Sequence, residues 1–315
     1  MVDLFNTVIG AQIVFTATFF LIPTLGEIFT ERSGVLNLGV EGMIIASAAG
    51  SYAVAYITGS YLIGILAGMV IGGSLSLIHA VMTITLSRNQ IISGIGLTIF
   101  GTGLSGYLGR GVAGKPLANK LENIPIPGFV DLPVLGHIFF EQNIIVYLSY
   151  FMVPILWFVL FKTRIGILIR TVGENPSAAY NQGVNVRLIR YLAVLFGGIC
   201  AGISGSMLSL NSLWVEGMTQ SRGWIVIALV VVALWNPLGA VLGSYIFGYF
   251  DVLQFSFQQT PIPLIFPDGI PAAILNAFPY VFTIIFLAIG AIILSRQKVK
   301  GILGAPTALA VPFEE

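Results

Sequence analysis

Charged side chains are scarce in this chain. Its 315 residues include only 14 Lys and Arg and 13 Asp and Glu, which together make up 9% of the sequence. Soluble globular domains carry about 25% charged residues, so this composition excludes a soluble globular protein. The formal net charge is +1. Because no basic stripe is present to neutralise phosphates, binding to nucleic acid through bulk charge is excluded as well.

The sequence also has few of the residues that disulfides, metal sites and active sites need. A single cysteine, Cys200, excludes a disulfide framework and a thiolate metal cluster. There is no phosphate-binding P-loop motif, no His-Glu-x-x-His and no pair of acids at membrane depth. We therefore expect a non-enzymatic chain that does not hydrolyse ATP itself.

One short motif favours an enzyme. Gly202-Ile-Ser-Gly205 resembles the Gly-x-Ser-Gly nucleophile motif of rhomboid-type intramembrane proteases. A serine nucleophile needs a base within hydrogen-bond reach, and in that family the histidine comes from a later span. No histidine follows Ser204, so the protease interpretation is weak.

Long apolar runs dominate the rest of the sequence, which is 57% hydrophobic. A transmembrane helix needs roughly 20 apolar residues. The sequence therefore predicts an all-α, polytopic membrane helix bundle, with one domain over residues 1–315 and about nine (8–10) transmembrane helices. The predicted spans are 10–29, 42–58, 60–86, 90–109, 143–161, 191–213, 223–235, 237–256 and 277–295. Pro23 and the glycines near 34–42 are places where a helix could break and shift this count.

The distribution of Lys and Arg predicts the orientation. Positive charges with a single acid, Glu174, gather in the segment 162–190, and more follow near the C-terminus. By the positive-inside rule both regions, and thus the C-terminus, are expected in the cytoplasm. The loop 110–142 mixes both charge signs and is expected outside, with the Pro-rich stretch 258–271 and the N-terminus. The positive residues are Lys162, Arg164, Arg170, Arg187, Arg190, Arg296, Lys298 and Lys300.

A short helix with both ends specified lies within 168–186, the long hydrophilic passage between two apolar runs. Asn175 is a good N-cap, and Pro176 suits the first helical position, where its missing N–H costs nothing. Gly183 supplies the left-handed residue that closes a helix of about two turns. Such a helix is unstable alone in water, so we expect it to rest on the protein surface as a docking element.

Two copies of one tetrapeptide suggest an internal repeat. Val40-Glu-Gly-Met43 recurs as Val215-Glu-Gly-Met218, each before an apolar run. In the predicted topology the first copy enters its helix from inside and the second from outside, as an inverted repeat would. Four matching residues leave both a repeat and a coincidence open.

Polar residues at membrane depth are the candidates for a solute path. Asn37 and Glu41 are four residues apart, which would place both on one face of a broken helix. Glu41 either lines the path or only satisfies the positive end of a helix. In the span 90–109, Gln90, Gly94, Thr98 and Thr102 recur every fourth residue, with Asn89 and Ser93 nearby. This stripe either lines a path for a polar solute or packs against other helices. His79, alone within a span, is expected to be a satisfied core residue.

Three passages resemble the membrane permease subunits of bacterial ABC importers of the ribose/branched-chain-amino-acid type. They are 31–43, 88–94 with 106–109, and 170–179 with Gly183. The resemblance is greatest to the nucleoside or simple-sugar permeases that work with basic-membrane-protein lipoproteins. It extends over most of the chain in the expected order.

The resemblance implies that 170–183 is the coupling helix that sits in a cleft of a cytoplasmic ATPase. Its residues would be Arg170, Gly173, Glu174, Asn175, Pro176, Ala179 and Gly183. The resemblance also implies that Asn37, Glu41, Asn89 and Gln90 lie near the translocation path, where the stripe adds Ser93 and Thr98.

The resemblance further implies a bacterial inner membrane location and a set of partners. These are a second, longer permease, an ATPase with two fused nucleotide-binding halves, an external substrate-binding lipoprotein and a small polar solute. ATP and Mg²⁺ would bind to the ATPase, with no cofactor in this chain. The favoured function is thus a permease subunit of an ATP-driven importer, for nucleosides or alternatively a simple sugar such as ribose. A stand-alone secondary transporter or channel is the other alternative, and the shortage of intramembrane acids beyond Glu41 argues against it.

Overall fold

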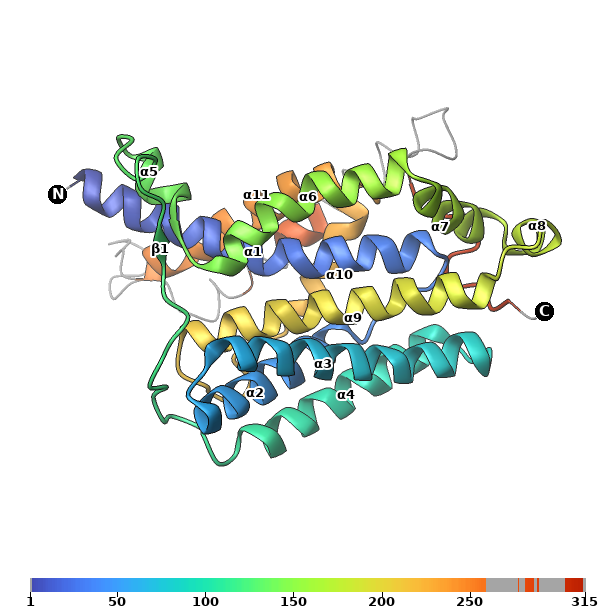
Figure 1. The fold of residues 1–315 in the computed structure, drawn as a ribbon, viewed down its shortest axis with the longest axis horizontal. Helices are drawn as coiled ribbons and strands as arrows, with labels where there is room; N and C mark the ends of the chain where they lie inside the picture. The colour runs from blue at the N-terminus through green and yellow to red at the C-terminus, as the bar shows by residue number, and fades with distance from the viewer. Residues whose placement is uncertain (1, 259–276, 278–280, 286–287, 289–303, 314–315) are drawn as a thin grey trace, which may run out of the picture.

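A computed structural model describes residues 2–258, 277, 281–285, 288 and 304–313. Its long helices lie side by side in one bundle (Figure 1). They are α1 (Val2–Arg32), α2 (Val40–Thr58), α3 (Tyr61–Ala80), α4 (Gln90–Gly109), α6 (Ile144–Lys162), α9 (Val186–Asn211) and α11 (Pro237–Gln258). A π-helical turn, η1 (Val81–Thr85), extends α3. The shorter helices are α5 (Leu135–Phe139), α7 (Arg164–Glu174), α8 (Pro176–Asn181) and α10 (Gly223–Val232). Strands β1 (Ile124–Pro125) and β2 (Glu141–Gln142) pair antiparallel, with Ile124 opposite Gln142.

Six helices of the described residues are long and apolar enough to cross a membrane, and two shorter apolar helices, Gly223–Val232 and Pro237–Leu253, accompany them. These eight coincide with eight of the predicted spans, although α10 has only 10 residues, too few to cross a membrane alone. The span 277–295, the stretch 258–271 and the charges Arg296, Lys298 and Lys300 lie largely or wholly outside the described residues.

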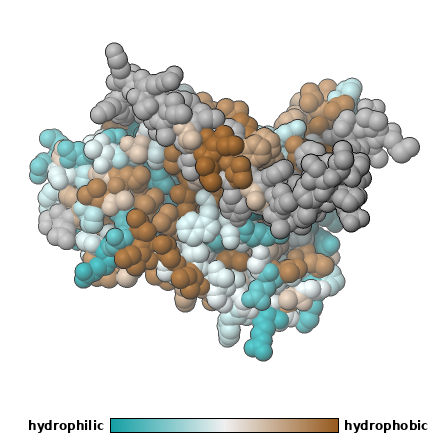
Figure 2. All heavy atoms as spheres, turned by 180° about the vertical axis from the view of Figure 1, so that it is seen from behind, coloured by the Kyte–Doolittle hydropathy of each residue, from teal (hydrophilic) through white to brown (hydrophobic). Residues whose placement is uncertain are grey.

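The surface of the bundle is suited to lipid. Large apolar side chains on several helices are more than half exposed, among them Leu66, Val70, Ile92, Ile99, Phe151 and Leu242. Seen from behind, hydrophobic side chains form broad patches on the surface, with hydrophilic ones at the left and lower edges (Figure 2). Large apolar side chains exposed on long helices are what contact with lipid favours.

The two ends of the bundle are distinct. At the end that we call the α8 end lie α7, α8 and the described C-terminal segment 304–313. The segment 110–142 with the β-hairpin lies at the opposite end, which we call the hairpin end, together with the N-terminus (Figure 1). Thr85 of η1 bonds Tyr191 near the start of α9, which places η1 at the α8 end. The segments predicted inside and outside thus lie at opposite ends.

Helix α1 does not break at Pro23, but ends at Arg32. Residues 33–39, which we call the α1–α2 break, are non-helical and precede α2. A second non-helical segment, 212–222, separates α9 from α10. Of the two places where the sequence analysis allowed a helix to break, the structure breaks the chain near the glycines of 34–42 and not at Pro23.

Helices α2 and α10 begin at the same point and run in opposite directions. The Glu41 carboxylate, in the first turn of α2, accepts a hydrogen bond of 2.6 Å from the Gly223 backbone N–H at the start of α10. Asn119 bonds the Gly59 carbonyl after α2, so α2 ends at the hairpin end. Trp235, after α10, bonds Glu31 at the α8 end of α1. Two helices that meet at their N-termini and run in opposite directions are the arrangement expected of an inverted repeat.

The two tetrapeptide copies occupy different environments within this arrangement. Val40–Met43 forms the first turn of α2, where Glu41 is buried. Val215–Met218 lies in the turn before α10, where Glu216 is exposed. The structure therefore supports a repeat at the level of helices, whereas the copies are not equivalent residue by residue.

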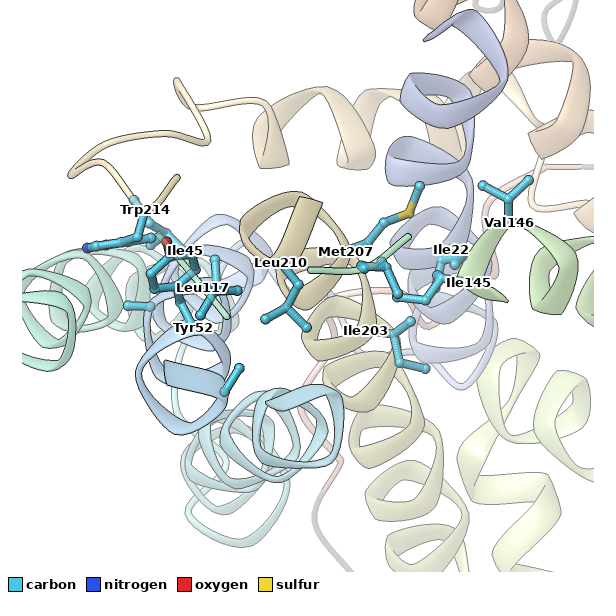
Figure 3. Close-up of a cluster of buried hydrophobic side chains, with 14 of the residues drawn as sticks. Ile22, Ile45, Tyr52, Leu117, Ile145, Val146, Ile203, Met207, Leu210 and Trp214 are labelled. Carbon is cyan, nitrogen blue, oxygen red and sulfur yellow. The ribbon is translucent and has the colours of Figure 1, made fainter. Parts of the chain in front are cut away.

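Helix α9 packs at the centre of the bundle against α1, α2 and α3. Its Ile203, Met207 and Leu210 join side chains from α1, α2 and α6 in a buried cluster (Figure 3). Between α2 and α4, Gly42 and Gly101 allow the backbones to touch, because a Cβ on Gly42 would lie 2.5 Å from the Leu97 carbonyl oxygen. Small residues at such crossings are typical of helix packing in lipid.

Candidate coupling surface and translocation region

Helix α8 has the two ends that the sequence predicts. The Asn175 side chain accepts a hydrogen bond from the Ala178 N–H at 2.9 Å, and Pro176 occupies the first turn. At the other end, Gly183 has φ of 80°. The Gly183 and Val184 N–H groups bond the carbonyls of Tyr180 and Ala179, at 2.8 and 3.1 Å. This pair of bonds is a Schellman motif, in which glycine takes the left-handed position without strain.

Helix α8 rests on the protein through one buried face. Ala179 is buried with Val172 of α7 and Val186 of α9, and Phe313 packs against them. The opposite face presents exposed neutral side chains. They are Ser177, Ala178, Tyr180, Asn181 and Gln182. The short helix is therefore held in place and turns an uncharged surface away from the bundle.

The remaining predicted coupling residues contact this chain itself. Gly173 is buried beside the Arg32 backbone. Glu174 accepts hydrogen bonds from the Thr307 N–H and hydroxyl at 3.2 and 2.6 Å. The Arg170 guanidinium lies 5.3 Å from the centre of the Phe161 ring. Their positions indicate that they shape the support of α8. The exposed Tyr180 and the segment 304–313 are missing from the sequence prediction.

Most of the predicted path residues hold the α1–α2 break in place. The Asn37 amide donates to Glu27 at 2.8 Å, and its oxygen accepts from the Gly39 N–H. Asn37 lies in the break and α2 begins only at Val40, so the prediction that Asn37 and Glu41 share one helix face is wrong. The glycines of 34–42 end the helix before that periodicity can apply.

Side chains of α3 and α4 satisfy the backbone of the same break. Gln90 accepts from the Leu36 N–H at 2.7 Å, and Thr98 donates to the Leu38 carbonyl at 3.0 Å. His79 bonds the Leu36 carbonyl through Nε2 and Ser93 through Nδ1, both at 3.0 Å. Non-helical backbone at membrane depth is tolerated only where protein satisfies it. Asn89 stands apart, as the exposed N-cap of α4.

More acids are buried within the bundle than the sequence analysis allowed. Glu27, Glu31 and Asp251 are 1–3% exposed. Glu27 and Asp251 lie inside the predicted spans 10–29 and 237–256, so the expected shortage of intramembrane acids beyond Glu41 is wrong. Glu27 and Glu31 are one turn apart on α1, and Asp251 pairs with Arg222 at 3.2 Å. Glu31 lies just beyond the predicted span 10–29, whereas Glu27 and Asp251 lie inside predicted spans and were overlooked.

Ser204 has a structural role. It is fully buried, and its hydroxyl donates to the Phe19 carbonyl at 2.7 Å. The imidazole of His79 is engaged with Leu36 and Ser93, and His137 pairs with Glu141 at the hairpin end. Neither histidine is placed to act as the base of a protease.

A polar hollow that sequence reasoning missed opens at the hairpin end. It encloses about 570 Å³ between α1, the segment 110–142, the end of α9 and α11. Val8, Ala11, Phe15 and Val252 form its apolar lining, and none of its lining residues that the structure describes is charged. Its polar lining consists of four carboxamides and one hydroxyl. They are Gln12, Asn123, Gln142, Asn211 and Thr16. Within the described part of the chain, only Gln142 of these five has a hydrogen-bond partner for its side chain.

Comparison with known proteins gives one family. The family model described as the branched-chain amino acid transport system permease component matches residues 9–289. The chain is 40% identical to a putative glucose ABC transporter permease, TsgC13, of Haloferax volcanii over 93% of both chains. It is 33% identical to the guanosine ABC transporter permease NupQ of Bacillus subtilis, over 99% of this chain and 98% of that one. The nucleoside ABC transporter permease NupC of Lactococcus lactis is 34% identical over 90% of this chain and 92% of its own.

Proposed function

Because the chain belongs to the family of branched-chain amino acid transport system permease components and is a multi-pass ABC transporter permease subunit, we propose that it forms half of the solute path of an importer for nucleosides. The chain is non-catalytic, and a separate ATPase of the transporter hydrolyses ATP. We further propose that α8 is the coupling helix through which that ATPase drives this chain. ATP and Mg²⁺ would bind in the ATPase.

One observation carries the coupling proposal. Helix α8 is capped at both ends, is buried on Ala179 and is exposed on the opposite face. A helix of six residues is not stable alone, and this one is made rigid by its supports. A rigid, uncharged projection fits a cleft on a partner. The buried Ala179 of α8 packs against Val172 of α7 and Val186 of α9, so a movement of α8 would be transmitted to these two helices.

The proposed orientation puts the α8 end, with the described C-terminal segment, in the cytoplasm. The hairpin end and the N-terminus then lie outside, where a lipoprotein would deliver solute. The excess of Lys and Arg in 162–190 supports a cytoplasmic location of the α8 end. A second permease is a partner in this family, and we propose that it is the longer of a heterodimeric pair in a bacterial inner membrane.

Nucleosides are the proposed solutes because two relatives, NupQ and NupC, bear nucleoside names and match nearly the whole chain. The polar hollow fits the same class. Its volume lies within the range of about 300–1,000 Å³ that is usual for small-molecule sites. Its amides offer hydrogen bonds to ribose hydroxyls and base edges, and the Phe15 ring offers a stacking face for a base. We propose that the hollow is the external entrance of the path.

A simple sugar is the alternative solute, and the 40% identity to TsgC13 favours it. The test is uptake by the complex that copurifies with this chain from its native membrane, reconstituted in vesicles with ATP inside or outside. We expect ATP-dependent uptake of labelled guanosine. Uptake of labelled glucose or ribose without guanosine would select the sugar alternative. Solute uptake by the chain alone without ATP would refute the importer.

A further inference from the structure

The described C-terminal segment, residues 304–313, lies against α7 and α8. Its residues 307–310 form a turn, closed by hydrogen bonds from Leu309 N–H to Pro306 and from Val311 N–H to Ala308. Ala308 is 8% exposed at the centre of this turn. The segment is therefore packed on the bundle and is not a free tail.

The turn caps the end of α7. The Ala308 N–H donates to the Gly173 carbonyl at 2.9 Å. The last four carbonyls of a helix have no partner within the helix, so Ala308 satisfies an acceptor that α7 leaves open. Next to it, Thr307 donates twice to one oxygen of Glu174. Two successive residues of the segment thus hold the last two residues of α7, immediately before the N-cap of α8.

The same turn reaches the α1–α2 break. The Ala310 N–H donates to the Gly34 carbonyl at 3.3 Å. Gly34 has φ of 91°, and a Cβ there would lie 3.3 Å from the Ala308 carbonyl oxygen. The turn therefore joins the end of α7 to the first residues of the break, whose backbone His79, Gln90 and Thr98 hold from the other side.

The end of the segment continues onto α8. The Phe313 ring lies 6.1 Å from the Tyr180 ring, and 6.0 Å from the Arg190 guanidinium. Tyr180 is 47% exposed and Val311 is 50% exposed. Tyrosine is enriched at the centre of protein interfaces, and here an exposed Tyr180 lies among neutral polar side chains of α8 and beside the segment that carries Val311.

We propose that the segment 304–313 is part of the coupling unit: it fastens α7 and α8 to the α1–α2 break and lies beside α8 on the surface that meets the ATPase. This inference rests on the proposed coupling role of α8. A push on α8 reaches Glu174 and Gly173 at the end of α7. The turn 307–310 passes it to Gly34, and so to the non-helical backbone within the bundle.

The first experiment changes single groups of the Thr307 side chain in the purified complex of this chain with its ATPase. Thr307→Val removes the hydroxyl that bonds Glu174, and Thr307→Ser keeps it. We expect Thr307→Val to leave complex yield and basal ATP hydrolysis unchanged and to lower solute-stimulated hydrolysis about two- to tenfold, the worth of one such bond. Thr307→Ser should restore the stimulation. A merely structural role would lower yield and basal hydrolysis together, and that result, like full stimulation in Thr307→Val, would overturn the proposal.

Tyr180→Asp, on the exposed face of α8, separates this inference from the coupling proposal. If Tyr180→Asp uncouples hydrolysis from solute and Thr307→Val does not, the inference about 304–313 is wrong and α8 keeps its role. If both variants stay fully coupled, the coupling proposal itself fails.

The second experiment tests the surface. A photo-crosslinking residue at Val311 should capture the ATPase subunit in the intact complex. The same residue at Phe129, which is 54% exposed at the hairpin end, should not. Absence of an ATPase adduct from position 311 would show that the segment does not face that partner.

Discussion

The hydroxyl of Ser204 on α9 donates to the carbonyl of Phe19 on α1, four residues before Pro23. Proline has no N–H, so within a helix it leaves the carbonyl four residues earlier without its usual donor. In lipid such an acceptor must find another partner. Ser204 is that partner, which explains both the unbroken α1 and the serine of the protease-like motif.

This hydrogen bond predicts that the effect of a Ser204 substitution on the free energy of unfolding depends on Pro23. Ser204→Ala should lower the stability of the purified chain by about 1 kcal/mol, the usual worth of a hydrogen bond between membrane helices. Ser204→Thr should preserve most of it. When Pro23→Ala is added, the new N–H can bond Phe19 itself, so Ser204→Ala should then cost much less. Denaturant unfolding of these variants beside the wild type forms the test. An equal loss from Ser204→Ala with and without the Pro23→Ala substitution would contradict the explanation.

The crossing of α2 and α4 gives a second prediction with a matched control. At Gly101 a Cβ would lie 2.6 Å from the Cα of Gly42, whereas at Gly103 nothing lies within 4 Å. Gly101→Ala should therefore destabilise the bundle by about 1–3 kcal/mol through overpacking. Gly103→Ala, on the same helix, should be neutral or slightly stabilising. Thermal unfolding in detergent measures both, and similar values for the two variants would refute the close approach.

Features that depend on neighbouring residues could be predicted from the sequence. The apolar runs predict the spans, and Asn175, Pro176 and Gly183 predict α8, because capping involves residues only a few positions apart. The positions of 110–142 and 162–190 at opposite ends also follow from counting spans.

Features that depend on long-range contacts could not be predicted. Asn37, Gln90 and Thr98 were expected along the path, yet their bonds end on the break and on Glu27. Glu41 bonds Gly223, 182 positions away, and Thr307 bonds Glu174, 133 positions away. The same polar residue types can line a solute path or hold the backbone of another segment in place, and only the folded structure distinguishes the two roles.

Gly183 tests whether the shape of α8 matters for coupling. Its φ is 80° and nothing lies within 4 Å of a Cβ at this position, so Gly183→Ala adds backbone strain without a clash. This strain is worth about 1–2 kcal/mol. It should loosen α8 and reduce solute-stimulated ATP hydrolysis. Gly183→Asn should be milder, because asparagine tolerates the left-handed conformation better.

The readout for Gly183 is the ratio of solute-stimulated to basal hydrolysis in the complex. Gly59→Ala serves as the control, since Gly59 has φ of 68° and open space around it but lies at the hairpin end. An equal effect of the two substitutions on the ratio would mean that general instability, and not the coupling helix, is responsible.

The polar hollow at the hairpin end makes a prediction about solute affinity. Gln12 and Asn211 line it, and neither side chain has a hydrogen-bond partner among the described residues. Their removal therefore leaves no protein group unsatisfied. Gln12→Ala and Asn211→Ala should keep stability and basal hydrolysis, and each should raise the KM for guanosine uptake about two- to tenfold, because each loses one hydrogen bond to solute.

Two further variants decide between binding in the hollow and general damage to this end of the bundle. Asn119→Ala removes an exposed amide of the same end that bonds the Gly59 carbonyl outside the hollow, so its KM should stay at the wild-type value. Gln142→Ala removes bonds to the Ala11 and Ile138 carbonyls, so it should lower stability as well as uptake. If Gln12→Ala and Asn211→Ala instead leave the KM unchanged, solute does not pass through the hollow, and the entrance must lie on another face of the bundle.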